Sequence, residues 1–257
     1  MASNRPPTIE IRPDVWIDAR RALWLSALRV LVVADLHWGY AATHRARGNL
    51  LPEWGDEDIA ARLRTLLEDY RPAEMIWLGD SLHGLPGRGA AEHFIDTLPE
   101  TPIAVVAGNH DARWRRASGK SLSRGGFFLH HGDRKLEVPK GLVEIIGHLH
   151  PAVRWGDGAG GNLRLPALVD SPGRLVLPAF SPWSAGRPWN ASLRPGESLW
   201  GVASRRIFHL PHAFLNPTAG PTARRGAARE RTSAASRPPS GQARPRPGSG
   251  SAAGSSD

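Results

Sequence analysis

The chain has 257 residues, 40% of them hydrophobic, which is enough for one large α/β domain or two small ones. It has no cysteine, so disulfide bonds, thiolate ligands and iron–sulfur clusters are excluded, and any metal must be held by His, Asp, Glu, Asn or water. The net charge of +9 favours a polyanionic partner, but more than half of that excess lies after residue 216.

The N-terminal part of the chain predicts three short strands. Alternating apolar stretches over residues 8–11, 15–17 and 22–25 are typical of a meander that covers one sheet. The residues before them lack the apolar stretch of a secretory signal, and no run in the chain approaches the roughly 20 apolar residues that span a bilayer. We therefore expect a cytoplasmic protein that makes no membrane contact.

Three apolar runs separated by helical patterns predict parallel βαβ units. The strands cover residues 29–34, 75–78 and 103–107. Between the first two, Asp56 can cap a helix that places apolar residues on one face and ends at Arg71 and Pro72. A second helical stripe precedes the third strand. This alternation is typical of a sheet with helices packed against it.

The second half of the chain predicts a different arrangement. Further strands cover residues 127–129, 143–146, 162–169 and 174–177, and the last two are so closely connected that they should pair antiparallel. The two halves together predict an α/β fold, a layered sandwich of two mixed β-sheets flanked by helices, over residues 1–216.

The last segment, 217–257, has the composition of a disordered basic tail. It consists mostly of Ala, Arg, Gly, Pro, Ser and Thr, with seven arginines and two acidic residues. Such a segment buries too little apolar surface to offset the entropy lost on ordering. The tail is either an arm that adds salt-sensitive contacts to phosphates or a dispensable extension.

Polar residues with metal-ligating side chains follow five of the apolar runs. The candidate ligands are Asp35, His37, Asp80, Asn109, His131, His148 and His150. In open α/β sheets, ligands bind outside the carboxyl ends of the strands, so five such ends can converge on one crevice. Imidazole nitrogens mixed with carboxylate and amide oxygens suit Mn²⁺, Fe²⁺ or Zn²⁺.

Local sequence supports this convergence. Glycine adjoins a candidate ligand at four places, Gly79, Gly108, Gly132 and Gly147. Glycine permits a sharp turn and a close approach of the backbone to a ligand. Asp35 and His37 are two residues apart, as are His148 and His150, so in an extended chain each pair would share one side. Adjacent residues of a strand face opposite sides, so only one of His130 and the preferred His131 should enter the site.

These blocks resemble the calcineurin-like metallophosphoesterase superfamily over about residues 30–150. The ordered blocks are Asp35-x-His37, Gly79-Asp80, Gly108-Asn109-His110-Asp111, His131-Gly132 and Gly147-His148-x-His150. The resemblance implies two metal ions, one held by Asp35, His37 and His150, the other by Asn109, His131 and His148, with Asp80 bridging. It further implies that His110 is the general acid or transition-state stabiliser, and that Asp111 orients it.

Longer stretches at residues 31–39, 146–153 and 175–180 are similar to the branch of bacterial ligase-associated metallophosphoesterases and their archaeal relatives. This resemblance implies a two-metal phosphodiesterase or nuclease in DNA processing or repair. Mn²⁺ is the expected metal, with Fe²⁺ or Zn²⁺ as alternatives. It also implies a phosphoester substrate such as DNA, and association with a DNA ligase or helicase. The sequence gives no indication of the oligomeric state.

Other functions stay open at this point. A nucleotide or small phosphomonoester phosphatase would use the same ligands, and a non-catalytic scaffold could share the fold. The chain retains every expected ligand, which argues against the scaffold. The sequence after Asp80 lacks the Asp-Arg-Gly of protein Ser/Thr phosphatases, and His83 there reads as an ordinary loop histidine. Trp38 and Trp114 follow two of the blocks and either stack on a base or line a pocket or, as we favour, pack in the core or at its rim.

Overall fold

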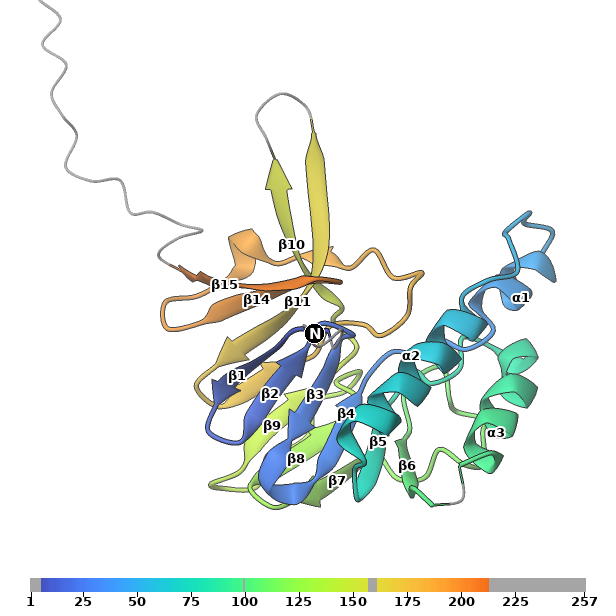
Figure 1. Cartoon of the computed structure of the whole chain (residues 1–257), viewed down its shortest axis with the longest axis horizontal. Coiled ribbons are helices and arrows are strands. Elements are labelled where there is room, and N and C mark those ends of the chain that lie inside the picture. The colour runs from blue at the N-terminus through green and yellow to red at the C-terminus, as the bar shows by residue number, and fades with distance from the viewer. Residues whose placement is uncertain (1–5, 99, 157–160, 213–257) are drawn as a thin grey trace, which may run out of the picture. The chain divides into compact units, whose positions relative to one another are not determined.

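The computed structural model describes residues 6–98, 100–156 and 161–212, whose strands form two β-sheets (Figure 1). The six strands of the first sheet lie in chain order, β1 to β6. They are β1 (Thr8–Arg12), β2 (Val15–Asp18), β3 (Ala22–Leu25), β4 (Val30–Val33), β5 (Glu74–Leu78) and β6 (Ile103–Val106). Strands β4, β5 and β6 are parallel, as predicted. The predicted meander does not cover this sheet but extends it, because β3 pairs antiparallel with β4.

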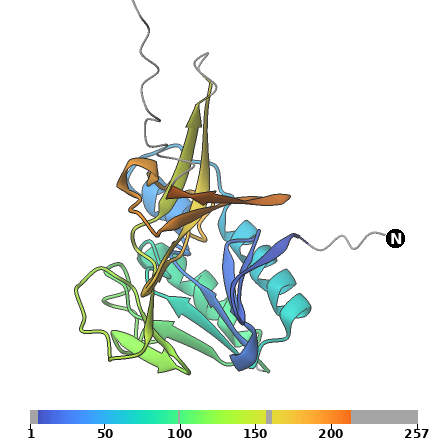
Figure 2. The same ribbon diagram turned by 90° about the vertical axis from the view of Figure 1, so that its left-hand side faces the viewer.

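The second sheet has nine strands in the part of the chain that the structure describes. They are β7 (Ser121–Arg124), β8 (Phe127–His130), β9 (Val143–Ile146), β10 (Pro151–Gly156), β11 (Asn162–Ser171), β12 (Arg174–Val176), β13 (Arg187–Pro188), β14 (Ser198–Ala203) and β15 (Arg206–Pro211). Strands β11 and β12 pair antiparallel, as predicted, while β8, β9 and β12 are parallel. In Figure 2, β10 and β11 extend as a hairpin away from the other strands.

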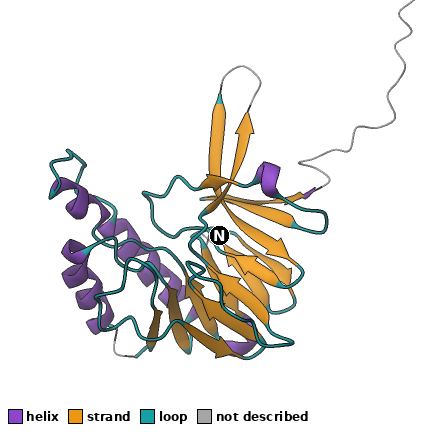
Figure 3. Cartoon of the chain, turned by 180° about the vertical axis from the view of Figure 1, so that it is seen from behind, coloured by secondary structure: helices purple, strands orange, loops and turns teal. Residues whose placement is uncertain are grey.

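Two hydrophobic clusters explain the layers. Alternate residues of a strand face opposite sides of a sheet. Val32 and Ile76 on one face of the first sheet pack with Leu129 and Ile145 of the second sheet, while Trp77 lies on the other face, toward the helices. Figure 3 shows the longer helices gathered on one side of the strands. The predicted α/β sandwich of two mixed sheets is confirmed.

The α-helices of the described residues are α1 (Tyr40–Arg45), α2 (Asp56–Tyr70) and α3 (Arg88–Asp96). The predicted end of α2 is confirmed, since Arg71 adopts a left-handed φ of 43° and its N–H bonds to the Leu67 carbonyl. The predicted cap is wrong. Gly55 occupies the cap position, and the carboxylate of Asp56 accepts the Gly39 N–H at 2.9 Å.

The described residues bear on the membrane prediction but do not reach the predicted tail or domain boundary. Among the described residues, no helix has the length and apolar character needed to cross a membrane. The predicted disordered basic tail, 217–257, lies outside the described residues. The predicted domain boundary at residue 216 also falls there, so both stay predictions.

Candidate metal centre

The loops that follow β4, β5, β6 and β9 are joined by hydrogen bonds. The His37 N–H donates to the Asp80 carbonyl at 3.0 Å. The His148 N–H donates to Oδ2 of Asp35 at 2.9 Å, and the His110 N–H donates to Oδ1 of Asp80 at 2.9 Å. The carboxylates therefore hold the loops together as well as facing the site. The strand ends converge, as the sequence led us to expect.

Two groups of three side chains could each hold a metal ion. Within each group, the ligand atoms lie within 4.8 Å of one another. The groups are Asp35, His37 and His150, and Asp80, His131 and His148. In the first, Nε2 of His150 lies 3.1 Å from Oδ1 of Asp35. In the second, Nε2 of His131 lies 3.2 Å from Oδ2 of Asp80, and Nδ1 of His131 is 3.9 Å from Asp35. The two groups are therefore neighbours in one cluster.

The backbone is left-handed at five of the seven candidate ligands. The φ angles are 56° at Asp35, 54° at His37, 46° at Asp80, 62° at His148 and 43° at His150. The expectation of an extended chain at Asp35/His37 and at His148/His150 is therefore wrong, and tight turns bring these side chains together instead. A left-handed conformation costs a non-glycine residue about 1–2 kcal/mol. Strain concentrated in this way is typical of functional sites.

Glycines beside the cluster leave room for the carboxylates. A Cβ at Gly108 would lie 2.3 Å from both the N and Oδ1 atoms of Asp80, and one at Gly147 would lie 2.6 Å from Oδ2 of Asp35. Real Cβ atoms do not approach this closely. Gly132 differs, because its nearest neighbour would be a carbon of Ile146 at 3.2 Å rather than a ligand.

We expect Gly108→Ala to lower the free energy of unfolding by about 1–3 kcal/mol, because the new methyl group must displace Asp80. Metal content should fall with it. The control is Gly89→Ala in α3, where a Cβ meets nothing within 4 Å. This control should raise stability by about 0.5 kcal/mol. Urea unfolding and metal analysis of both variants check the prediction, and equal stability of the two would contradict it.

His131 is oriented by a backbone carbonyl. Its Nδ1 lies 3.1 Å from the Leu78 carbonyl, which can only accept, so Nδ1 carries the proton and donates. Nε2 then faces Oδ2 of Asp80 and, at 3.2 Å, Nδ1 of His148. Histidines that bind metals are commonly fixed in this way by a hydrogen bond at the other ring nitrogen.

The neighbouring His130 faces away from the cluster. Its Nε2 lies 2.8 Å from Oε1 of Glu144, and both side chains are buried. Glu144 also pairs with Arg174 on β12. Of the two adjacent histidines, the structure places His131 in the cluster and gives His130 a partner in the second sheet.

Burial and charge shift the pKa values of the cluster. Burial lowers the pKa of His37 to about 4, which keeps its imidazole neutral at neutral pH. Burial alone would raise the pKa of Asp80, but the hydrogen bond and charge of His131 and the His110 N–H outweigh it and lower that pKa. Burial opposes a charge on His131, yet Asp80 and Asp35 raise its pKa. The carboxylates of Asp35 and Asp80 thus favour positive charge beside the His131 ring.

The residues present fit divalent cations. Nδ1 of His37 is buried and has no hydrogen-bond partner among the described residues. Nε2 of His131 and Nδ1 of His148 face each other at 3.2 Å, where a single proton can serve only one lone pair. A cation accepts lone pairs from both. Imidazole and carboxylate ligands without thiolates suit borderline ions such as Mn²⁺, Fe²⁺ and Zn²⁺.

The predicted acid and the predicted amide ligand lie at the rim. His110 and Asn109 are both exposed. Nδ1 of His110 lies 3.1 Å from the His83 carbonyl and donates to it, which leaves Nε2 for a reacting group. The ring centroids of His110 and His37 are 5.3 Å apart. His110 is therefore placed to act beside the candidate ligands.

The buried carboxylate of Asp111 bonds to backbone rather than to the His110 ring. It accepts N–H groups from Ser81 at 3.1 Å, Leu82 at 2.9 Å and Gly108 at 3.1 Å. Burial nevertheless raises its pKa. Asp111 thus fixes the loop that carries Asp80, contrary to the predicted role of orienting His110.

Sequence reasoning missed two residues of the cluster. His83 lies with His37 and His110 in a third group of possible ligands, and burial lowers its pKa to about 4. Its only signal was its place three residues after Asp80. The hydroxyl of Ser184 lies 2.9 Å from Nδ1 of His150, and it comes from a loop with no motif.

The favoured interpretation of Trp38 and Trp114 as packed residues is confirmed, since they are 2% and 3% exposed and lie in the core.

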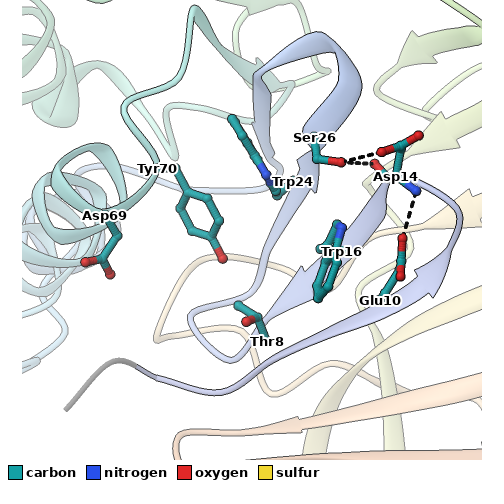
Figure 4. Close-up of a pocket in the computed structure, with 8 residues that line it drawn as sticks. All are labelled: Thr8, Glu10, Asp14, Trp16, Trp24, Ser26, Asp69 and Tyr70. Atoms are coloured by element: carbon teal, nitrogen blue, oxygen red, sulfur yellow. Dashed lines mark hydrogen bonds between the residues drawn. The ribbon is translucent and has the colours of Figure 1, made fainter. Parts of the chain in front are cut away.

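A separate hollow of about 460 Å³ lies over the meander and α2 (Figure 4). It is lined by Thr8, Glu10, Asp14, Trp16, Trp24, Ser26, Asp69 and Tyr70. The Ser26 hydroxyl donates to Asp14, and Glu10 accepts the Asp14 N–H. None of the predicted ligands lines this hollow, so the candidate chemistry lies at the strand ends.

Comparison with known proteins agrees with this fold and cluster. The family described as calcineurin-like phosphoesterase matches residues 28–182, and the chain belongs to this family. Its domain is that of metal-dependent hydrolases of ester bonds.

The chain is similar to three known proteins. The crystal structure of the Pseudomonas putida nuclease MPE is 26% identical, covers 80% of this chain and all of its own, and superposes with a TM-score of 0.62. YfcE, a phosphoesterase from E. coli, is 15% identical with a TM-score of 0.38, covering 70% of this chain and 97% of its own. A probable inactive purple acid phosphatase 28 of Arabidopsis thaliana is 32% identical over 91 residues. That match covers 32% of this chain and only 23% of the plant protein.

Proposed function

We propose that the chain is a two-metal phosphodiesterase that cleaves nucleic acid. The observation that carries this proposal is the meeting of two ligand groups, one around Asp35 and one around Asp80, within one cluster. Support for a nucleic-acid substrate comes from the likeness to the nuclease MPE, which spans the whole of that structure. The seven arginines after residue 216 would add affinity for phosphates.

The side chains divide the work as follows. Asp35, His37 and His150 would hold one cation, and His131, His148 and Asn109 would hold the other, with Asp80 serving both. When bound, such a pair of cations neutralises charge on the phosphoryl oxygens and lowers the pKa of water. His110, through the Nε2 that its bond to His83 leaves available, donates a proton to the leaving oxygen. Asp111 keeps the Asp80 loop in place.

Mn²⁺ is our proposed metal, since Asp and Asn oxygens make up part of the ligand set. The prediction follows that a chelator removes phosphoester turnover and that Mn²⁺ restores it. The measurement is hydrolysis of bis-p-nitrophenyl phosphate before and after dialysis against chelator, with Mn²⁺, Fe²⁺ and Zn²⁺ added back separately. Turnover that persists in metal-free protein would contradict the proposed function.

A substrate panel tests the finer proposal. Single-stranded DNA, duplex DNA, RNA, cyclic nucleotides and simple monoesters are compared with Mn²⁺ at equal concentration. We expect DNA strands to be cleaved with the highest kcat/KM. Preferred hydrolysis of monoesters would favour a phosphatase, and no turnover of any phosphoester would favour a scaffold. The association with a DNA ligase or helicase stays a prediction that co-purification tests.

A further inference from the structure

A row of aromatic rings runs from the candidate metal centre to an exposed tryptophan. His83 lies edge-on to His37, with ring centroids 5.4 Å apart. Tyr40 lies 4.5 Å from His83, and Trp183 stacks on Tyr40 at 5.4 Å with 11° between the ring planes. Trp54 ends the row, 4.4 Å from Trp183. We call Tyr40, Trp183 and Trp54 the aromatic row; the proposed hydrolysis does not require it.

Hydrogen bonds join the chain segments that carry the first and last rings of the row. The Gly39 N–H donates to Asp56 at 2.9 Å, so the start of α1 lies beside the start of α2. Arg45 of α1 donates to the Leu51 carbonyl at 2.8 Å, which holds the segment leading to Trp54. Tyr40 opens α1 and Trp54 stands two residues before Asp56, so these bonds fix both ends of the row.

The middle ring is fixed to both sides. Gly55 has a φ of 110°, and a Cβ there would lie 2.3 Å from Nε1 of Trp183, so only glycine admits the indole. Ser184, the next residue after Trp183, lies 2.9 Å from Nδ1 of the candidate ligand His150. The row is therefore attached to the metal centre at Trp183 as well as at Tyr40.

Exposure and charge favour a ligand on this row. Trp54 is 48% exposed, and Tyr40 and Trp183 are half-buried, so the row reaches the surface. Arg47 is an exposed arginine two residues after α1, the helix that Tyr40 opens, so it supplies positive charge on the same segment. Aromatic side chains beside positive charge bind unpaired nucleic-acid strands, because every base has a π-face and every linkage a negative charge.

We propose that the aromatic row binds an unpaired nucleobase of the strand whose phosphate lies at the metal centre. This inference rests on the proposed function. His83 connects the two parts, since its carbonyl accepts a bond from His110 and its ring contacts Tyr40. A base within a duplex is already stacked on its neighbours, so the row selects single strands. Stacking on one aromatic side chain changes affinity by about 5- to 150-fold.

The test uses the full chain with Mn²⁺ and measures inhibition of bis-p-nitrophenyl phosphate hydrolysis by two competing strands. One strand is oligothymidylate, and the other is an abasic strand of equal length. In Trp54→Ala, the inhibition constant of oligothymidylate should rise about tenfold while that of the abasic strand is unchanged. Trp54→Phe, which keeps an aromatic ring, should retain most of the wild-type affinity for oligothymidylate.

The matched control is Trp155→Ala, because Trp155 on β10 is 47% exposed and lies outside the row. It should leave both inhibition constants unchanged. Equal weakening of both strands by Trp54→Ala would overturn the inference, since the loss would then concern backbone contacts or folding. Unchanged binding of oligothymidylate would overturn it too. If the wild-type chain hydrolyses no phosphoester, the proposed function fails and this inference fails with it.

Discussion

Asp80→Asn is expected to lower kcat/KM for bis-p-nitrophenyl phosphate by at least about 100- to 1,000-fold. In the wild-type chain, Oδ2 of Asp80 lies 3.2 Å from Nε2 of His131, while Oδ1 of Asp80 accepts the N–H of His110. One carboxylate thus touches both a candidate ligand and the loop of the proposed acid. The amide of Asn carries no negative charge, so it would hold both cations more weakly than the carboxylate.

Metal content distinguishes this loss from simple misfolding. Purified Asp80→Asn should retain less than half of the metal that the wild-type chain holds, as measured by mass spectrometry, because a bridging ligand serves both ions. The control is Asp96→Asn, whose side chain is 61% exposed and pairs with Arg116. This control should keep both metal and turnover. An Asp80→Asn protein with full metal content and normal turnover would refute the bridging role.

His110→Ala is expected to keep its metals and to lose about 100- to 10,000-fold in turnover of a DNA strand. The ring is exposed and belongs to neither the group around Asp35 nor the group around Asp80, so its removal should leave both groups in place. The loss should be much smaller with bis-p-nitrophenyl phosphate, because nitrophenolate leaves without being protonated. This difference between substrates would assign the proton transfer to His110.

The comparison requires a histidine that is equally accessible but lies elsewhere. His93→Ala in α3 supplies it, since His93 is exposed. This variant should turn over both substrates at the wild-type rate. If His110→Ala loses the same factor with a nitrophenyl ester as with DNA, the residue acts by some means other than protonating the leaving group.

Strong periodic patterns made much of the fold predictable. The apolar face of α2 and the buried runs of β4, β5 and β6 each allow one arrangement only, since any other would expose their side chains. Strands such as β7 and β13 escaped prediction because they are short and carry few apolar residues. Asp56 fits a cap by local chemistry, but its carboxylate is used by Gly39, a contact between segments that no local pattern contains.

The sequence predicted six side chains of the cluster but not its geometry, and it missed His83 and Ser184. Motif spacing identified the ligand candidates, yet it implied extended chain where Asp35 and His37 are left-handed. The three N–H bonds to Asp111 depend on how two loops meet, which spacing does not specify. The aromatic row joins Tyr40, Trp54 and Trp183 from three segments, and only the folded chain brings these rings into contact.

The central claim is that two ligand groups hold two cations side by side. Crystals grown with Mn²⁺ and measured at the manganese absorption edge test it directly, because anomalous scattering locates each ion. We predict two ions per chain, one contacting His37 and His150 and the other contacting His131 and His148, with Asp80 touching both. A single ion, or ions bound away from these side chains, would contradict the two-metal account.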